Sequence, residues 1–323
     1  MTASLNDWIS PRAAASPPRL ALGTMNFGKR TPEAEAQRII AIAEERGITL
    51  LDTANVYNEG ESERVVGRAI KKRRASFLVA SKVGLGRIGR GAEGLKKARV
   101  VAACEESLGR LGTDYLDIYY LHAPDHQTPL EDTLEGVGAL LQAGKIRSWA
   151  VSNYASWQIL EMFHLCERSG IAKPVMSQVI YNVLIRQLEI EYFKFASKYG
   201  LHSTIYNPLA GGLLSGKYRP GSQWESGGRF DANTMYQRRY WTERLLEVVA
   251  TYQTLAAPMD LVTFAYAWVG SRSGVDSILI GPSSIEHLEA AVRGCGAKLS
   301  ADLCKRVDEA HYAYTGSDET YAR

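Results

Sequence analysis

Short apolar segments alternate with longer amphipathic segments along almost the whole sequence. The short segments are rich in β-branched and aromatic residues, as buried strands are, and cover residues 19–23, 49–52, 77–82, 115–122, 146–152, 175–180, 202–206 and 275–281. The longer segments place apolar residues three and four positions apart, which predicts helices, over residues 32–46, 62–73, 96–111, 130–143, 157–169, 187–199 and 260–269. Eight strands separated by helices predict an α/β fold with a parallel sheet, and favour a closed (β/α)8 TIM barrel over an open Rossmann sheet.

The length of 323 residues fits either two domains or one α/β barrel with insertions. Because no long linker interrupts the alternation, we expect a single domain over residues 1–323, with an irregular segment at residues 1–18. Residues 209–239 are rich in Gly, aromatic residues and Arg and too irregular for one helix. They follow the seventh predicted strand, so we expect a long loop at the carboxyl-end face, where barrel enzymes build their active sites. The tail from residue 300 should begin as an amphipathic helix and lie over that face.

Charge and cysteine usage exclude several classes of protein. Lys and Arg number 38 and Asp and Glu 35, a balance that gives no reason to expect nucleic acid or a membrane surface as a partner. The sequence shows neither a secretory signal nor a run of about 20 apolar residues, so we expect a cytoplasmic protein. Its four cysteines are far apart and lack metal-ligand spacing, which indicates reduced thiols.

Four polar residues fall at or just after the ends of three successive predicted strands. Asp52 ends the second strand, Tyr57 lies in its loop, Lys82 ends the third strand and His122 ends the fourth. Each alone is an ordinary surface or capping residue, but strand ends converge at a barrel mouth. Reduction of a carbonyl needs a proton donor to the oxygen, and a phenol with a pKa of about 10 is a weak one. We therefore expect Lys82 to lower the pKa of Tyr57, Asp52 to hold Lys82, and His122 to orient the carbonyl oxygen or relay the proton.

Four motifs in this order resemble those of the aldo-keto reductases: LDTANVY at residues 51–57, SKV at 81–83, YLH at 120–122 and VSNY at 151–154. The resemblance extends from about residue 20 to the end of the chain. The segments HAPDH at 122–126, YNPLAGGLLSGKY at 206–218 and YAR at 321–323 are similar to the branch of aflatoxin aldehyde and succinic semialdehyde reductases. The resemblance implies an enzyme in which Tyr57, Lys82, Asp52 and His122 are the catalytic residues.

The resemblance also implies a nicotinamide cofactor, although the sequence has no Gly-rich Rossmann fingerprint. Ser152, Asn153 and Gln178 would bind the carboxamide, and Tyr206 would stack on the ring. The segment 208–216 would follow the diphosphate, and the start of the last barrel helix would bind a 2′-phosphate, so NADPH is expected and NADH is the alternative. His287 departs from the family's usual Gln or Arg. The expected cofactor residues are Gly23, Thr24, Met25, Asp52, Ser152, Asn153, Gln178, Tyr206, Asn207, Pro208, Leu209, Gly211, Leu213, Gly216, Lys217, Arg229, Gly281, Ser283, Ser284 and His287.

The substrate is expected to be a small carbonyl compound. The residues expected to bind it are Met25, Tyr57, His122, Tyr236, Arg239 and Arg323. Guanidinium groups bind carboxylates, so the resemblance favours a carboxylated aldehyde or a dicarbonyl, unless these arginines pair with surface acids instead. Two other functions stay open: a nucleotide-sugar ketoreductase, and a nicotinamide-sensing subunit like the potassium-channel β proteins. We expect a monomer or homodimer.

No metal site is expected. His122 and His126 have a four-residue separation that suits zinc on a helix, but Pro124 lies between them and no third ligand is evident.

Overall fold

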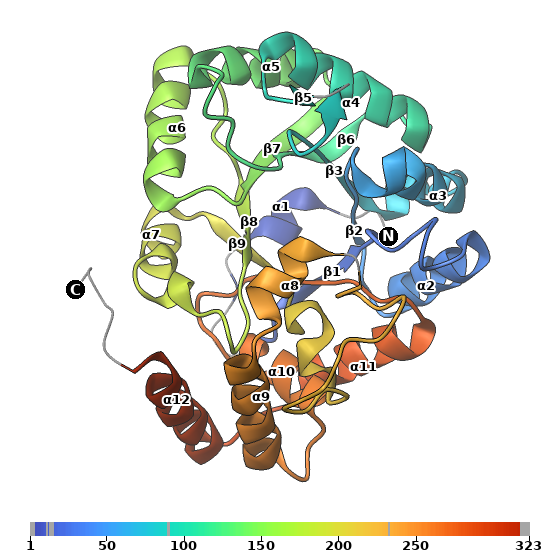
Figure 1. Cartoon of the computed structure of the whole chain (residues 1–323). Helices are drawn as coiled ribbons and strands as arrows, with labels where there is room; N and C mark the ends of the chain where they lie inside the picture. The colour runs from blue at the N-terminus through green and yellow to red at the C-terminus, as the bar shows by residue number, and fades with distance from the viewer. Residues whose placement is uncertain (1–3, 11, 13–15, 89–90, 232, 317–323) are drawn as a thin grey trace.

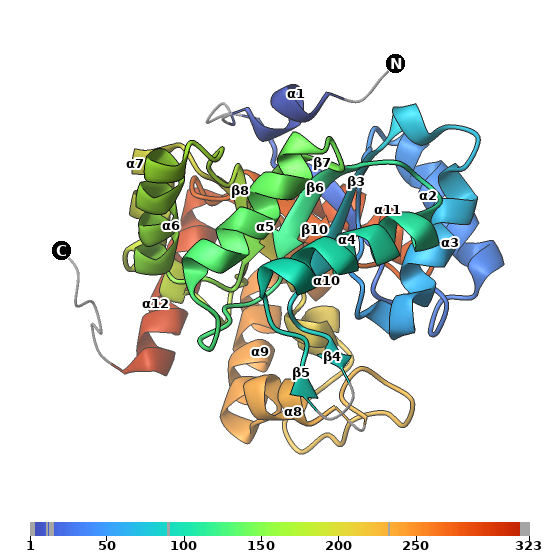
Figure 2. The ribbon, with the colours of Figure 1, turned by 90° about the horizontal axis from the view of Figure 1, so that it is seen from above.

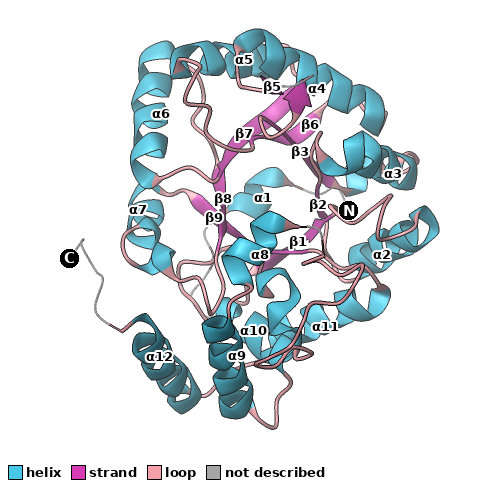
Figure 3. Cartoon of the chain, in the orientation of Figure 1, coloured by secondary structure: helices cyan, strands magenta, loops and turns pink. Residues whose placement is uncertain are grey.

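Eight parallel strands close into a barrel at the centre of the molecule (Figures 1 and 3). The computed structural model describes residues 4–10, 12, 16–88, 91–231 and 233–316. Around the barrel the strands follow the order β1-β10-β9-β8-β7-β6-β3-β2. Their bounds are β1 Arg19–Gly23, β2 Leu50–Asp52, β3 Leu78–Val83, β6 Leu116–Leu121, β7 Ile146–Ser152, β8 Met176–Ile180, β9 His202–Tyr206 and β10 Ser277–Ile280. The barrel confirms the predicted fold class.

A ring of helices surrounds the barrel (Figure 1). Those in the predicted segments are α2 Glu33–Glu45, α3 Glu61–Ile70, α4 Lys97–Leu111, α5 Leu130–Gln142, α6 Ser156–Ser169, α7 Tyr192–Tyr199 and α10 Leu261–Gly270. The segment predicted over 187–199 begins with a separate 3-10 turn, η3 (Gln187–Glu189). The ring also contains α9 (Glu243–Ala256), which was not predicted, and α11 (Ile285–Gly296).

Successive side chains along each strand point to opposite faces of the sheet, and this divides the core into two layers. Every second side chain faces the barrel interior, where Ala21, Leu50, Ala80 and Tyr120 belong to a cluster of buried side chains. The small alanines leave room for the Tyr120 ring. Neighbouring strand residues instead face outward and pack in the larger cluster with the helices. The barrel is therefore filled with side chains, and only its ends can hold a site.

A short helix occupies the segment that we expected to be irregular. Helix α1 (Leu5–Ile9) begins at Ser4, whose side chain accepts a hydrogen bond from the Asp7 amide. Its Trp8 side chain is 7% exposed, belongs to the interior cluster and lies 5.0 Å from the His202 ring. Burial of a large apolar side chain stabilises a helix that is too short to be stable alone.

The opposite end of the barrel carries the irregular segments. Figure 2 shows α1 at one end and, at the other, α8 (Thr234–Tyr240) and the small β4–β5 pair (Arg87–Ile88 and Gly91–Ala92). The long segment after β9 contains a 3-10 element, η4 (Ala210–Ser215), and α8, as expected for a segment that is not one helix. Helix α12 (Ala301–Thr315) packs beside α9, and the tail beyond it lies outside the described residues.

No helix in the described part of the chain combines the length and apolar character needed to cross a bilayer.

Candidate active site

Adjacent strands bring Asp52 and Lys82 together at the barrel mouth. Asp52 is the last residue of β2 and is paired in register with Ala80 of β3, while Lys82 follows two positions later on the same face of that strand. Lys82 Nζ forms an ion pair with Asp52 and donates a hydrogen bond to the Thr53 carbonyl at 2.8 Å. The two side chains are 0% and 1% exposed. Such a buried pair is stable only with good geometry and further hydrogen bonds, and here Gln178 Nε2 donates to the second Asp52 oxygen at 2.9 Å.

Tyr57 and His122 complete the group. The Tyr57 ring lies 5.0 Å from Lys82 Nζ and meets the His122 ring edge-on, with 5.8 Å between ring centroids. Tyr57 begins the turn η1 (Tyr57–Gly60), in which Asn58 has a φ of 50°. The Asn58 side chain donates to the carbonyls of Met25 and Phe27 at 3.0 and 2.7 Å and so holds this turn to the loop after β1. The structure thus places the four sequence-predicted residues next to one another.

The protonation states differ from the sequence-based expectation in one respect. Burial raises the pKa of the Tyr57 phenol well above its usual range, and the Asp52 carboxylate raises it further. We expected Lys82 to lower this pKa, but its charge is balanced by Asp52, so burial dominates. Burial also lowers the pKa of Lys82, against the opposing effect of Asp52.

His122 is a neutral imidazole at ordinary pH. Burial lowers its pKa well below the usual range, and the nearby Lys82 charge lowers it further. Its Nδ1 atom is buried and has no hydrogen-bond partner among the described residues. A protonated phenol and a neutral imidazole therefore lie next to each other at the mouth, a suitable arrangement for hydrogen bonding and proton donation to one oxygen.

The residues expected to bind the carboxamide form one hydrogen-bonded row beside this group. Ser152 Oγ donates to the Gln178 carbonyl at 2.9 Å, and Asn153 Nδ2 donates to the His122 carbonyl at 2.9 Å. The Tyr206 hydroxyl donates to Asn153 Oδ1 at 2.8 Å. The row thus connects the ends of β7, β8 and β9 to Asp52 and His122. Binding of a carboxamide would exchange some of these bonds for new ones.

The segment after β9 has features that fit a diphosphate. Gly211 and Gly212 have φ values of 69° and 103°. A Cβ at Gly211 would lie 2.5 Å from the Tyr236 ring, so the packing of that ring requires glycine there, whereas the space beside Gly212 is open. Asn207 Oδ1 accepts the Gly211 amide at 3.1 Å. Ser215 Oγ is buried and has no partner among the described residues, which leaves a polar atom for a ligand.

Some expected cofactor residues are committed to other contacts. Leu213 is fully buried in the core, and Lys217 forms an ion pair with Glu225. Thr24 is also buried, and its hydroxyl is hydrogen-bonded to the Asp52 carbonyl and to Ser62. Thr24 therefore supports the strand end that carries Asp52.

The start of α11 contains both expected and unexpected polar groups. Ser284 caps the helix by accepting the His287 amide, and Ser283 Oγ lies 3.0 Å from His287 Nδ1. Helix amino termini attract anions. However, the Ile285 amide already donates to the Glu35 carboxylate at 3.2 Å. Glu35 lies 250 positions away in the sequence, so no local pattern could have indicated this contact.

Arginines occupy the outer part of the mouth. Arg229 donates to Asn26 Oδ1 at 3.0 Å, and its guanidinium lies 5.5 Å from the Tyr236 ring. Asn26 in turn donates to the Gly281 carbonyl at 3.3 Å, which places Arg229 near the end of β10. Met25 is partly exposed beside it.

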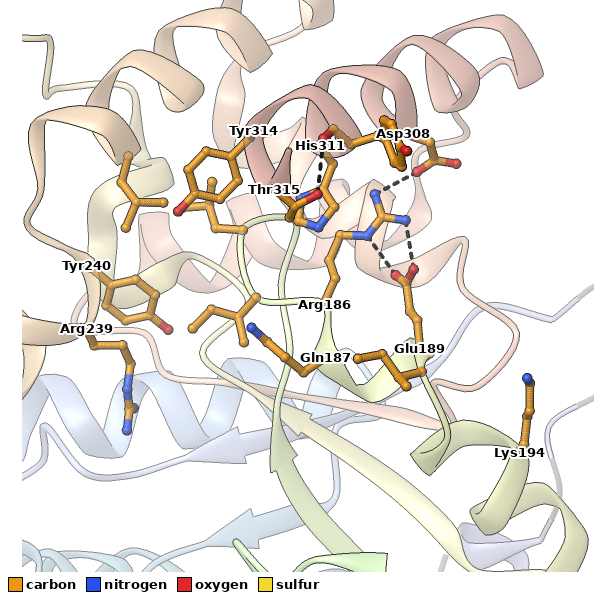
Figure 4. A pocket seen from close by; sticks show the side chains of 15 residues that line it. Arg186, Gln187, Glu189, Lys194, Arg239, Tyr240, Asp308, His311, Tyr314 and Thr315 are labelled. Atoms are coloured by element: carbon orange, nitrogen blue, oxygen red, sulfur yellow. Dashed lines mark hydrogen bonds and ion pairs between the residues drawn. The ribbon is translucent and has the colours of Figure 1, made fainter. Parts of the chain in front are cut away.

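Arg239 connects the mouth to a neighbouring cleft. Arg239 interacts electrostatically with Tyr206: burial raises the pKa of the Tyr206 phenol, and the Arg239 charge partly offsets this rise. Arg239 also lines a cleft of about 670 Å³, in which Arg186 is paired with Glu189 and Asp308 (Figure 4). No ion pair within the described part of the chain includes Arg239, so its charge is not committed to a surface acid. Arg323, the other expected arginine, lies outside the described residues.

Potential metal ligands do not gather in the described ranges: no group of three or more His, Cys, Asp or Glu side chains there could hold an ion. The four cysteines, all in the described part, are free thiols.

Comparisons with known proteins identify the family of this chain. The model of the aldo/keto reductase family matches residues 19–311. Aflatoxin B1 aldehyde reductase member 2 of Rattus norvegicus is 36% identical over 87% of this chain and 81% of its own length. Aldo-keto reductase family 7 member A3 of Homo sapiens is 34% identical over 87% of this chain and 89% of its own length. A probable voltage-gated potassium channel subunit beta of Arabidopsis thaliana is 29% identical over 82% of this chain and 83% of its own length.

Proposed function

Because the chain belongs to the aldo/keto reductase family, we propose that it reduces an aldehyde or a reactive ketone to an alcohol, with NADPH as the hydride source and Tyr57 as the proton donor. The observation that supports this most directly is the arrangement at the barrel mouth. The Tyr57 phenol meets neutral His122 edge-on, and both adjoin the buried pair of Lys82 and Asp52. This group suits the protonation of one carbonyl oxygen.

The polar row at the ends of β7 to β9 supports the choice of cofactor. Ser152, Asn153 and Gln178 would hold the carboxamide, and Tyr206 would lie against the ring. The open space beside Gly212 and the unpartnered Ser215 hydroxyl would suit the diphosphate, and Ser283 and Ser284 would serve a 2′-phosphate. When bound, the nicotinamide supplies the hydride.

The residues of this chain supply the proton and stabilise the charge that remains. Tyr57 is protonated at neutral pH, as any phenol with a pKa of about 10 is, and burial and Asp52 raise its pKa further. After it donates its proton to the carbonyl oxygen, the phenolate needs a cation. Lys82 uses two of its three N–H donors on Asp52 and Thr53, which leaves one for that oxygen. Asp52 keeps Lys82 charged, and neutral His122 donates a hydrogen bond to the substrate oxygen.

The substrate that we favour carries a carboxylate or a second carbonyl group near the reacting carbon. Arg239 lies beside Tyr206, outside the ion pairs of the described residues, and can bind such a group as a charge-assisted donor. Activity should be measured with both NADPH and NADH against succinic semialdehyde, phenanthrenequinone and keto sugars. Preference for the keto sugars would favour the nucleotide-sugar alternative.

The decisive experiment for the chemistry is Tyr57→Phe. General acid catalysis contributes roughly 10²- to 10⁴-fold, so we expect kcat to fall by about that factor, while the dissociation constant for NADPH, measured by fluorescence titration, changes little. A Tyr57→Phe enzyme with the kcat of the wild type would refute the proposed acid.

The relative from Arabidopsis thaliana is named as a channel subunit, and this makes a sensing role the second candidate. Turnover kinetics separate the two. An enzyme releases its product and its oxidised cofactor and completes many cycles, whereas a sensor would oxidise its bound cofactor once and stop.

A further inference from the structure

The side chain of Glu93 lies among the loops at the mouth and is bound by three different segments of the chain. Glu93 follows β5, at the end of the barrel opposite α1 (Figure 2). Its side chain is 3% exposed. Charged side chains are seldom buried unless their charge and hydrogen-bonding capacity are satisfied.

Four N–H donors satisfy this carboxylate. Oε1 accepts from Asn55 Nδ2 at 2.7 Å and from Arg99 Nε at 3.1 Å. Oε2 accepts from the backbone amides of Gly84 and Gly86 at 2.8 and 3.0 Å. Arg99 balances the charge and is itself held by Glu106 through two hydrogen bonds of 2.8 and 2.7 Å.

Three of these donors, all except Arg99 of α4, belong to the loops that follow β2 and β3, next to Tyr57 and Lys82. Asn55 precedes Tyr57 by two positions, and Gly84 follows Lys82 by two. The backbone of the Tyr57 loop is also bound to β3, through Thr53 N to Ala80 at 2.9 Å and through a longer bond from Asn55 N to Lys82 at 3.3 Å. The Asn55 side chain thus adds a short bond at the part of the loop nearest Tyr57.

The local backbone is adapted to receive the carboxylate. A Cβ at Gly86 would lie 2.8 Å from Glu93 Oε2, so the close approach depends on glycine. Gly84 has a φ of 112°, which L-residues rarely adopt. Two residues after Glu93, the Leu95 amide donates to Asp125 Oδ2 at 2.8 Å, and Asp125 belongs to the loop that follows His122. Residues 93–95 therefore contact the loops of Tyr57, Lys82 and His122 together.

We propose that Glu93 is a positioning residue for carbonyl reduction: through Asn55 and the amides of residues 84 and 86 it fixes the Tyr57 loop against the end of β3. The proposal rests on the proposed function. In the structure Tyr57 approaches Lys82 through its ring, at 5.0 Å, so the placement of the phenol depends on the loop that carries it. A displacement of about 1 Å at a reacting group can cost about 100-fold in rate.

The test is Glu93→Gln, which keeps the size of the side chain but replaces one acceptor oxygen with an N–H donor that cannot accept. The two hydrogen bonds that the replaced oxygen accepted are then lost, either those of Asn55 and Arg99 or those of Gly84 and Gly86. We expect kcat to fall about 10- to 100-fold, the KM for NADPH to stay within about twofold, and the high-pH limb of the kcat profile to shift, because the surroundings of the Tyr57 phenol change. A purely structural role would lower the amount of folded enzyme without moving that pH profile.

Asp117→Asn is the matched control. Asp117 is equally buried and accepts the Val79 amide at 2.9 Å and Arg74 at 2.7 Å, near the start of β3, away from the mouth. It should lose stability while keeping the kcat of the wild type. Asn55→Ala removes the loop contact alone and should reproduce the fall in kcat, so it decides the matter if Glu93→Gln does not fold.

A kcat within about twofold of the wild type in folded Glu93→Gln or in Asn55→Ala would overturn the proposal, as would an equal fall in Asp117→Asn. Failure of this proposal and failure of the proposed function are distinguishable. An inactive Tyr57→Phe together with a fully active Glu93→Gln rejects only the positioning role, whereas an active Tyr57→Phe rejects the proposed acid.

Discussion

Replacing Lys82 by methionine would leave the Asp52 carboxylate buried without its cation. Asp52 is 1% exposed, and of its two partners only Gln178, at 2.9 Å, would remain. Removal of one partner of a buried ion pair costs about 3–5 kcal/mol. With an unfolding entropy of about 2.1 cal/mol/K per residue, a chain of 323 residues loses about 1.5 °C of Tm for each kcal/mol, so we expect Lys82→Met to lower Tm by roughly 4–7 °C at pH 7.5. Urea or thermal unfolding measures this loss.

The pH dependence and a double variant identify the cause. An unpaired buried carboxylate has a raised pKa, so folded Lys82→Met would bind a proton that its unfolded chain, with a pKa of about 3.9, releases. The deficit relative to the wild type should therefore be complete at pH 7.5 and shrink as the pH falls toward 5. Asp52→Asn combined with Lys82→Met removes the charge and should recover more than half of the loss. The reasoning fails if Lys82→Met is as stable as the wild type, or if the double variant is less stable than the single one.

Two further predictions concern buried histidine and the choice of cofactor. Burial lowers the pKa of His202 from 6.5 to about 4, so between these values the unfolded chain binds a proton that the folded chain does not. As the pH drops through that window, His202 should lower the free energy of unfolding by about 3 kcal/mol. Urea unfolding at pH 7 and 4.5 should therefore show a smaller loss of stability in His202→Gln than in the wild type. An equal loss in both would contradict the assignment of this effect to His202. The Glu35 carboxylate accepts the Ile285 amide at 3.2 Å, at the helix start where we propose that a 2′-phosphate binds. Glu35→Gln removes this negative charge, so it should lower the KM for NADPH about 2- to 5-fold and leave the KM for NADH unchanged. An equal change for both cofactors would count against this placement.

The sequence was sufficient for features that depend on local pattern. All eight barrel strands coincide with predicted apolar segments, because strands buried on both faces must be apolar along their length. Asp52, Lys82 and His122 could be singled out because each lies at or next to the end of a strand, and parallel strands end at one face. Tyr57 needed the resemblance as well, since a tyrosine in a loop carries no signal of its own.

Features that depend on distant contacts could not be predicted. Helix α1 gains its stability from Trp8 packing inside the barrel, and nothing within residues 4–10 indicates that surface. Glu93 is an ordinary glutamate in sequence, and the role that we propose for it depends on donors 7 and 38 positions away. We expected the Tyr57 pKa to be lowered, and this direction was wrong. The shift depends on burial and on the balance of the Lys82 charge by Asp52, and neither can be judged without the fold.

The placement of α1 has a practical consequence for handling the protein. Helix α1 lies on the outer end of the barrel opposite α8 and the β4–β5 pair (Figure 2). A fluorophore or a solid support attached to the exposed side of α1 would face away from the mouth. Molecules immobilised in this orientation would present their catalytic ends to the solution, and diffusion of cofactor and substrate would be unobstructed by the anchoring surface.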